Sequence, residues 1–136
     1  MPEKDLFYAR HDERKRMNSL LAEHVMGWIV IPDNYAWRKK DGTILHSYRE
    51  VWDPWEEIKF AWEIVEEFAF VCGLTEIHFA PDTRQWCVTF DTRDIEMTVE
   101  DRSICRAICL AALKAKGIPF QIDPDVELVM NREAIH

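Results

Sequence analysis

The segment from Asp53 to Gly73 places the strongest constraint on what this chain can fold into. Asp53, Pro54 and Glu56 are typical of a helix start, because they supply a capping carboxylate, a first-turn proline and a glutamate that can reach back to the cap. The helix should run to about Cys72 and stop at Gly73. Its apolar residues fall on one wide stripe, namely Trp55, Ile58, Ala61, Trp62, Val65, Phe68, Ala69 and Cys72. Such a stripe must pack on a large surface, so the chain has to supply further layers.

Two more segments have helical periodicity. Apolar residues and His24 recur on one face of residues 12–26, and Gly27 supplies a left-handed stop. A third helix is expected through Ile104 to Ala112, after a capping box made by Thr98 and Asp101, with Gly117 as its end. Ser103, just before this helix, is also interpreted as capping chemistry.

The remaining segments are typical of antiparallel strands. A strand over residues 28–31 precedes a hairpin with a two-residue turn at Asp41 and Gly42. Residues 76–80 and 85–91 alternate around a Pro-Asp turn, and residues 94–99 alternate again. The order of these elements predicts the α+β class, as a small antiparallel sheet with helices packed on both faces.

Length and composition predict one globular domain over residues 1–136. The 48% hydrophobic and 31% charged residues exclude a disordered or low-complexity chain. Residues 1–11 are expected to be a flexible N-terminus, and residues 118–136 a C-terminal extension.

Charge and hydropathy exclude two classes of partner. Asp and Glu number 25 against 17 Lys and Arg, so the net charge is −8 and there is no basic stripe for sequence-specific binding of nucleic acid. No apolar run is long enough to span a membrane, and the charged start at residues 1–5 does not resemble a signal peptide. We therefore expect a cytoplasmic protein.

The four cysteines lie in apolar runs and form no Cys-x-x-Cys pair. This pattern favours buried, reduced thiols over a disulfide framework or a zinc site. They are Cys72, Cys87, Cys105 and Cys109.

Three stretches carry a resemblance to a known family. They are Leu20–Trp28, Ala61–Glu66 and Ile104–Ala115, in that order along the chain. Together they resemble the phage ABA sandwich domain over about residues 17–117. The resemblance implies a sheet with helices on both sides and an accessory role in a phage or prophage, and it carries over no catalytic residue.

Aromatic and basic residues gather around the irregular segment between the first strand and the second helix. Tryptophan faces beside cations can stack on a base or hold a phosphate, so this segment is the predicted ligand-binding site. Its candidate residues are Trp37, Arg38, Lys39, Trp52 and Trp55. The alternative is that these tryptophans only pack the core and brace the hairpin.

Catalytic chemistry has weaker support in the sequence. His24, His78 and Asp91 could assemble as a base with an orienting carboxylate, but no nucleophile motif, phosphate loop or metal-ligand spacing accompanies them. We expect no catalytic residue, metal or cofactor. The carboxylates of the second helix are interpreted as a solvated face; they are Glu56, Glu57, Glu63, Glu66 and Glu67.

These observations favour a non-enzymatic binding protein of a phage or prophage. It would act on a host protein or sequester a small ligand, a nucleotide being one candidate, in the cytoplasm of the host cell. Self-association into a homo-oligomer is expected. The alternatives are a small hydrolase that uses His78 with Asp91, and a structural or assembly protein.

Overall fold

The computed structural model describes residues 14–31, 36–46, 52–72, 74–91 and 96–120. The expected flexible residues 1–11 lie outside this part of the chain, as does the extension after residue 120. A helix over residues 14–20 continues into a π-helical turn. The other elements follow in the order η1 (Leu21–Val25), β1 (Ile29–Ile31), β2 (Ala36–Arg38), β3 (Ile44–His46), α2 (Ile58–Cys72), β4 (Leu74–Ala80), β5 (Gln85–Asp91), β6 (Glu96–Asp101) and α3 (Ile104–Ala115).

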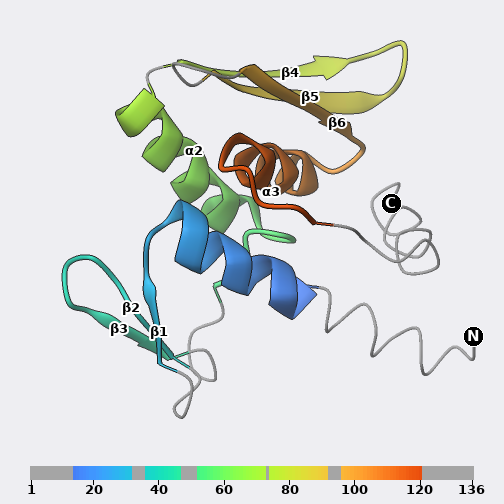
Figure 1. Cartoon of the computed structure of the whole chain (residues 1–136). Helices are drawn as coiled ribbons and strands as arrows, with labels where there is room; N and C mark the ends of the chain where they lie inside the picture. Colours follow the sequence, from blue (N-terminus) through green and yellow to red (C-terminus); the bar gives the residue numbers. More distant parts are fainter. Residues whose placement is uncertain (1–13, 32–35, 47–51, 73, 92–95, 121–136) are drawn as a thin grey trace, which may run out of the picture.

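The strands form two antiparallel sheets of three strands each. The short sheet has the order β1-β2-β3, and the long sheet has the order β4-β5-β6. Figure 1 shows the helices lying between the two sheets, with α2 and α3 beneath the long sheet and the N-terminal helix next to the short one. The α+β class is confirmed, as a sandwich of helices and sheets. The strands divide between two sheets, and the helices cover one face of the long sheet, where helices on both faces of a single sheet were expected.

The core lies between the long sheet and the helices. Val88, Phe90 and Val99 point from the long sheet into this core, and the Phe90 ring stacks on Phe68 of α2 with centroids 4.3 Å apart. Helix α3 packs against β5 and β6, and its small residues allow close approach. The opposite face of the sheet carries exposed Glu76 and Glu100.

The N-terminal helix ends in a π-helical turn that alters which residues are buried. The amide of Met26 donates to the carbonyl of Leu21 at 2.9 Å, a bond that spans five residues. Val25 is buried, as its place on the apolar face predicts, whereas the wider turn leaves His24 outside that face. His24 is exposed, so its expected place on the apolar face is wrong. Gly27 ends the turn with φ of 71°, as predicted.

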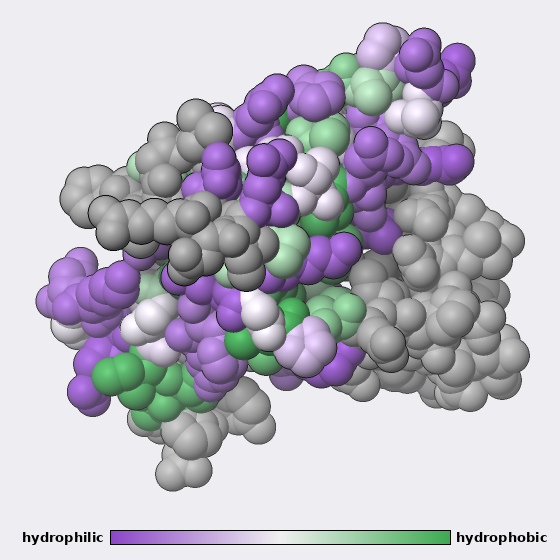
Figure 2. Space-filling view, turned by 45° about the horizontal axis from the view of Figure 1, so that its top comes forward, coloured by the Kyte–Doolittle hydropathy of each residue, from purple (hydrophilic) through white to green (hydrophobic). Residues whose placement is uncertain are grey.

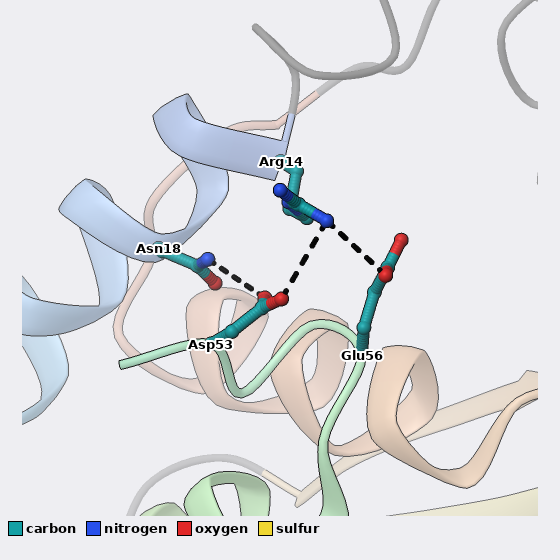
Figure 3. A network of polar contacts seen from close by, with 4 residues as sticks. All are labelled: Arg14, Asn18, Asp53 and Glu56. Carbon is teal, nitrogen blue, oxygen red and sulfur yellow. Dashed lines mark hydrogen bonds and ion pairs between the residues drawn. The ribbon is translucent and has the colours of Figure 1, made fainter. Parts of the chain in front are cut away.

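Helix α2 begins at Ile58, four residues later than the sequence predicts. The Asp53 carboxylate is not used as the cap, because it accepts a hydrogen bond from Asn18 Nδ2 at 2.9 Å and faces Arg14 at 3.7 Å (Figure 3). Arg14 also pairs with Glu56 at 3.2 Å. The N-terminal helix therefore takes both carboxylates that were expected to form the capping box.

The apolar stripe of α2 is narrower than predicted. The core takes Ala61, Ile64, Val65 and Phe68, all of which are buried. Three members of the expected stripe stay exposed, namely Ile58, Trp62 and Ala69.

The β2–β3 turn is one residue longer than the sequence predicts. Gly42 alone has positive φ here, at 90°, and its amide donates to the carbonyl of Lys39 at 3.0 Å. This geometry is a type I turn followed by a left-handed glycine, in a loop of three residues. The amide of Thr43 donates to the Asp41 carboxylate at 2.9 Å, and this bond lowers the pKa of Asp41.

The start of α3 follows Ser103 and not the expected box. The Ser103 hydroxyl accepts a hydrogen bond from the amide of Arg106 at 3.3 Å, as a helix cap does. Thr98 instead lies within β6, with its hydroxyl 2.9 Å from that of Thr89. Buried Arg106 pairs with Asp101 at 3.3 Å.

Three of the four cysteines are free and buried, as predicted: Cys87, Cys105 and Cys109. The side chain of Cys72 lies outside the described part. Burial, followed by the nearby Asp53 carboxylate, raises the pKa of Cys105 from its ordinary 9.0 to about 11. None of the helices in the described residues is both long and apolar enough to cross a membrane.

Candidate functional site

A groove of about 460 Å³ opens between the short sheet and α2. We call it the hairpin groove. On the side of the short sheet the lining is a lysine and two apolar residues. On the side of α2 it is two glutamates, a lysine and a phenylalanine. The groove is lined by Lys39, Leu45, Trp52, Glu57, Lys59, Phe60 and Glu63.

Three tryptophans form an aromatic wall on the side of the short sheet, in which Trp52 lines the hairpin groove and Trp28 and Trp37 pack against it. The ring centroids of Trp28 and Trp52 lie 4.7 Å apart, and that of Trp37 lies 6.3 Å from Trp52. These tilted arrangements match the favourable geometry of aromatic pairs. Trp52 is only 4% exposed, so its ring is held by packing on nearly all sides.

A hydrogen bond joins this aromatic wall to α2. The indole Nε1–H of Trp52 donates to Glu63 Oε2 at 2.6 Å. Because the acceptor is charged and the pair is partly buried, this bond is stronger than one between neutral groups. It fixes both the tryptophan ring and the carboxylate that face the groove.

Lysines of the protein already occupy cationic positions around the groove. The Lys39 ammonium lies 5.3 Å from the centre of the Trp28 ring, and that of Lys59 lies 4.7 Å from the Phe60 ring. Lys40, at the turn of the hairpin, pairs with Glu67 of α2 at 2.9 Å. Each of these cations rests on a ring or a carboxylate.

A second depression of about 400 Å³ adjoins the hairpin groove. The two share Lys39 and Glu63, and the second is also lined by Met26, Trp28, Glu66 and Glu67. The hairpin groove alone is lined by two carboxylates and two ammonium groups, and the second depression adds the carboxylates of Glu66 and Glu67. Taken together the two hollows therefore favour a positively charged ligand.

The structure brings together three of the five predicted site residues. Lys39 and Trp52 line the hairpin groove, and Trp37 packs against Trp52 without lining it. Arg38 lies on the opposite face of the short sheet, because successive side chains of a strand alternate. Trp55 is buried elsewhere, with its ring 6.3 Å from Phe120 and 5.4 Å from the Arg106 guanidinium.

Comparison with known proteins places the chain in a family. The sequence profile of the phage ABA sandwich domain matches residues 19–113. The chain belongs to this family. All the residues that line the two hollows lie within the matched part of the phage ABA sandwich domain.

A solved structure has the same fold as this phage ABA sandwich domain. It is the 2.0 Å crystal structure of a phage protein from Bacillus cereus ATCC 14579, at a TM-score of 0.61 and 20% sequence identity. The likeness covers 80% of this chain and 91% of that one. No curated protein matches the chain.

Sequence reasoning missed several groove residues of this phage ABA sandwich domain. Trp28 was assigned only to a strand, and Phe60 to no site. Glu63 was assigned to a solvated face, whereas it is partly buried and bonded to Trp52. For Trp28 and Glu63 the available signal was the high number of tryptophans and glutamates on segments that lie apart in the sequence, and no such signal marked Phe60.

The histidines of the catalytic alternative are not brought together with Asp91. In the long sheet His78 lies opposite Cys87, whereas Asp91 lies opposite Leu74 at the other end of the hairpin. His24 is 3.9 Å from Glu23 on the exposed side of the N-terminal helix. Within the described residues of this phage ABA sandwich domain, no group of three or more His, Cys, Asp or Glu could hold a metal ion.

Proposed function

We propose that this phage protein is a non-enzymatic binding protein that holds a cationic side chain of a host protein in the hairpin groove. The observation that carries the proposal is the pairing of a tryptophan wall with the carboxylates of α2. Trp52 and Glu63, which are joined by a 2.6 Å hydrogen bond, stand at its centre.

An arginine or lysine side chain suits such a groove on two counts. Its charge is attracted by the carboxylates of Glu57 and Glu63, and its cationic head can lie against an aromatic face. The apolar stem would pack on Leu45 and Phe60. Lys39, which rests on Trp28, is an example within the chain of the same kind of contact.

The combined charge of the two hollows favours a cationic side chain of a host protein over a nucleotide. A phosphate would meet the carboxylates that line both hollows, and Lys59, one of two lining lysines, lies 3.8 Å from Glu57. Like-charge contacts of this kind are costly. A partner in the host would place the interaction in the host cytoplasm.

The test uses small probes of matched shape, followed by NMR of ¹⁵N-labelled protein. N-acetyl-arginine methylamide is compared with the citrulline compound, which is its neutral isostere, and with AMP. The reporter is the indole Nε1–H signal of Trp52, identified by its loss in Trp52→Phe. The arginine probe should shift this signal in a saturable way, and the citrulline probe should not.

Two variants make the result specific to the groove. Glu63→Gln should weaken the response to the arginine probe, whereas Glu100→Gln, on the far face of the long sheet, should leave it unchanged. Equal responses to arginine and citrulline would contradict the proposed role of charge. Saturable shifts with AMP alone would instead support the nucleotide alternative.

A further inference from the structure

The outer face of the short sheet carries an exposed row of two isoleucines and one arginine. The strand register places Ile29 opposite Arg38, and Arg38 opposite Ile44. Ile29 is 59% exposed and Ile44 is 45% exposed, so the row is an apolar surface with a cation at its centre. Figure 2 shows a hydrophobic patch at the lower left, the side on which Figure 1 places β1–β3.

A second exposed apolar surface lies on α2. Ile58 and Trp62 are one helical turn apart and are each 47% exposed. Ala69 extends this stripe, and exposed Glu66 flanks it. Four members define what we call the α2 stripe: Ile58, Trp62, Glu66 and Ala69.

The two surfaces are complementary in both polarity and charge. The row has isoleucines on both sides of Arg38, and the α2 stripe has apolar residues on both sides of Glu66. Neither of these charges has an ion-pair partner among the described residues. Arg38 belongs to the hairpin on one side of the groove, and Glu66 lines the second depression beside it.

We propose that two copies of the chain associate about a twofold axis, with the row of one copy on the α2 stripe of the other. In such an arrangement each contact occurs twice, because residue i of one copy meets residue j of its partner and the reverse. Arg38 of each copy would then pair with Glu66 of the partner copy.

Charge favours the row and the α2 stripe over the outer face of the long sheet as the surfaces through which two copies associate. The outer face of the long sheet carries Glu76, Glu96 and Glu100, with no lysine or arginine on its described strands. Two copies meeting there would place like charges together, which is unfavourable. This inference does not depend on the proposed ligand of the hairpin groove.

Charge exchange tests the proposal on the full chain. Sedimentation velocity from about 1 to about 100 µM should give the mass of two subunits at the upper end. Arg38→Glu and Glu66→Arg should each weaken association by about tenfold or more, since each change acts at two symmetric contacts. The double variant with both changes should restore it, and Glu100→Arg should have no effect.

Trp62→Gln provides a test that does not involve charge. Trp62 is half-exposed in the single copy, so its replacement should weaken association while circular dichroism shows the fold unchanged. A single-subunit mass at every concentration would overturn the proposal. So would a mass of three or more subunits, or a dimer that is indifferent to both charge reversals.

Discussion

Trp52 and Glu63 join the aromatic wall of the hairpin groove to α2 through a 2.6 Å hydrogen bond from the indole Nε1–H to Oε2. Neither residue lies in the short sheet, yet both define the space beside it. The bond consequently has a structural role as well as a place in the candidate site.

Replacing the acceptor of this bond should destabilise the protein. Glu63→Ala leaves the partly buried indole N–H without its acceptor, which should lower the free energy of unfolding by about 1–2 kcal/mol. The matched change is Glu66→Ala, one helical turn away on the exposed side, which should alter it by less than about 0.5 kcal/mol. Urea unfolding at low protein concentration checks both, and equal effects would mean that the bond contributes nothing.

The buried contact between Asn18 and Asp53 should be another determinant of stability. Both residues are nearly inaccessible, at 6% and 5% exposure, and their side chains lie 2.9 Å apart. Asn18→Ala removes a donor from a buried carboxylate and should cost about 2 kcal/mol, because a charged group then loses a hydrogen bond. Thermal unfolding of the variant provides the measurement, and an unchanged midpoint would contradict this account.

The buried thiols should make the protein less stable in alkaline solution. Burial first, and then Asp53, raise the pKa of Cys105 from 9.0 to about 11, and burial also raises the pKa of Cys109. Between pH 9 and pH 11 the unfolded chain therefore loses protons that the folded chain retains, so the free energy of unfolding falls as pH rises. Below pH 9 the effect disappears.

Cys105→Ala should flatten part of this alkaline slope. Urea unfolding at several pH values from about 7.5 to about 10.5 would measure it in both proteins. Identical slopes for the variant and the natural chain would show that Cys105 is not responsible. In the folded protein Cys105 and Cys109 should also react slowly with iodoacetamide, because the thiolate is the reactive form and their raised pKa disfavours it.

The left-handed glycine of the β2–β3 turn should tolerate asparagine better than alanine. Gly42 has φ of 90° and no atom within 4 Å of an added Cβ, so the penalty comes from the backbone alone. Gly42→Ala should cost about 1 kcal/mol, and Gly42→Asn less, because asparagine adopts the left-handed region more readily. Thermal unfolding distinguishes the two, and a larger loss for asparagine would point to a steric cause.

Local sequence signals predicted the elements whose ends are set by their own residues. Helix α3 begins after the Ser103 cap and ends at Ala115, two residues before Gly117, whose φ of 73° stops the helix. The β4–β5 hairpin pairs over residues 74–80 and 85–91, close to the segments that alternation indicated. In these cases the residues that decide the conformation lie within a few positions of the element itself.

Features that depend on residues distant in the sequence were not predicted. The start of α2 moved to Ile58 because Asn18, 35 positions before Asp53, binds the carboxylate that was expected to cap the helix. His24 is exposed because the helix ends in a π-helical turn, and the 3.6-residue spacing of apolar residues in the sequence does not predict such a turn. The groove likewise depends on two segments that meet only in the folded chain, so sequence indicated Trp37, Lys39 and Trp52 but not Glu63.

The division of the strands into two sheets has an energetic consequence. In the described residues no backbone ladder connects β1–β3 to β4–β6, and side-chain contacts such as Lys40 with Glu67 hold the hairpin to α2. Those contacts can break while the long sheet and α3 remain folded. Amide protons of the short sheet should therefore exchange with solvent through local opening, well before those of β5. In this subglobal opening the two sides of the hairpin groove would separate without global unfolding.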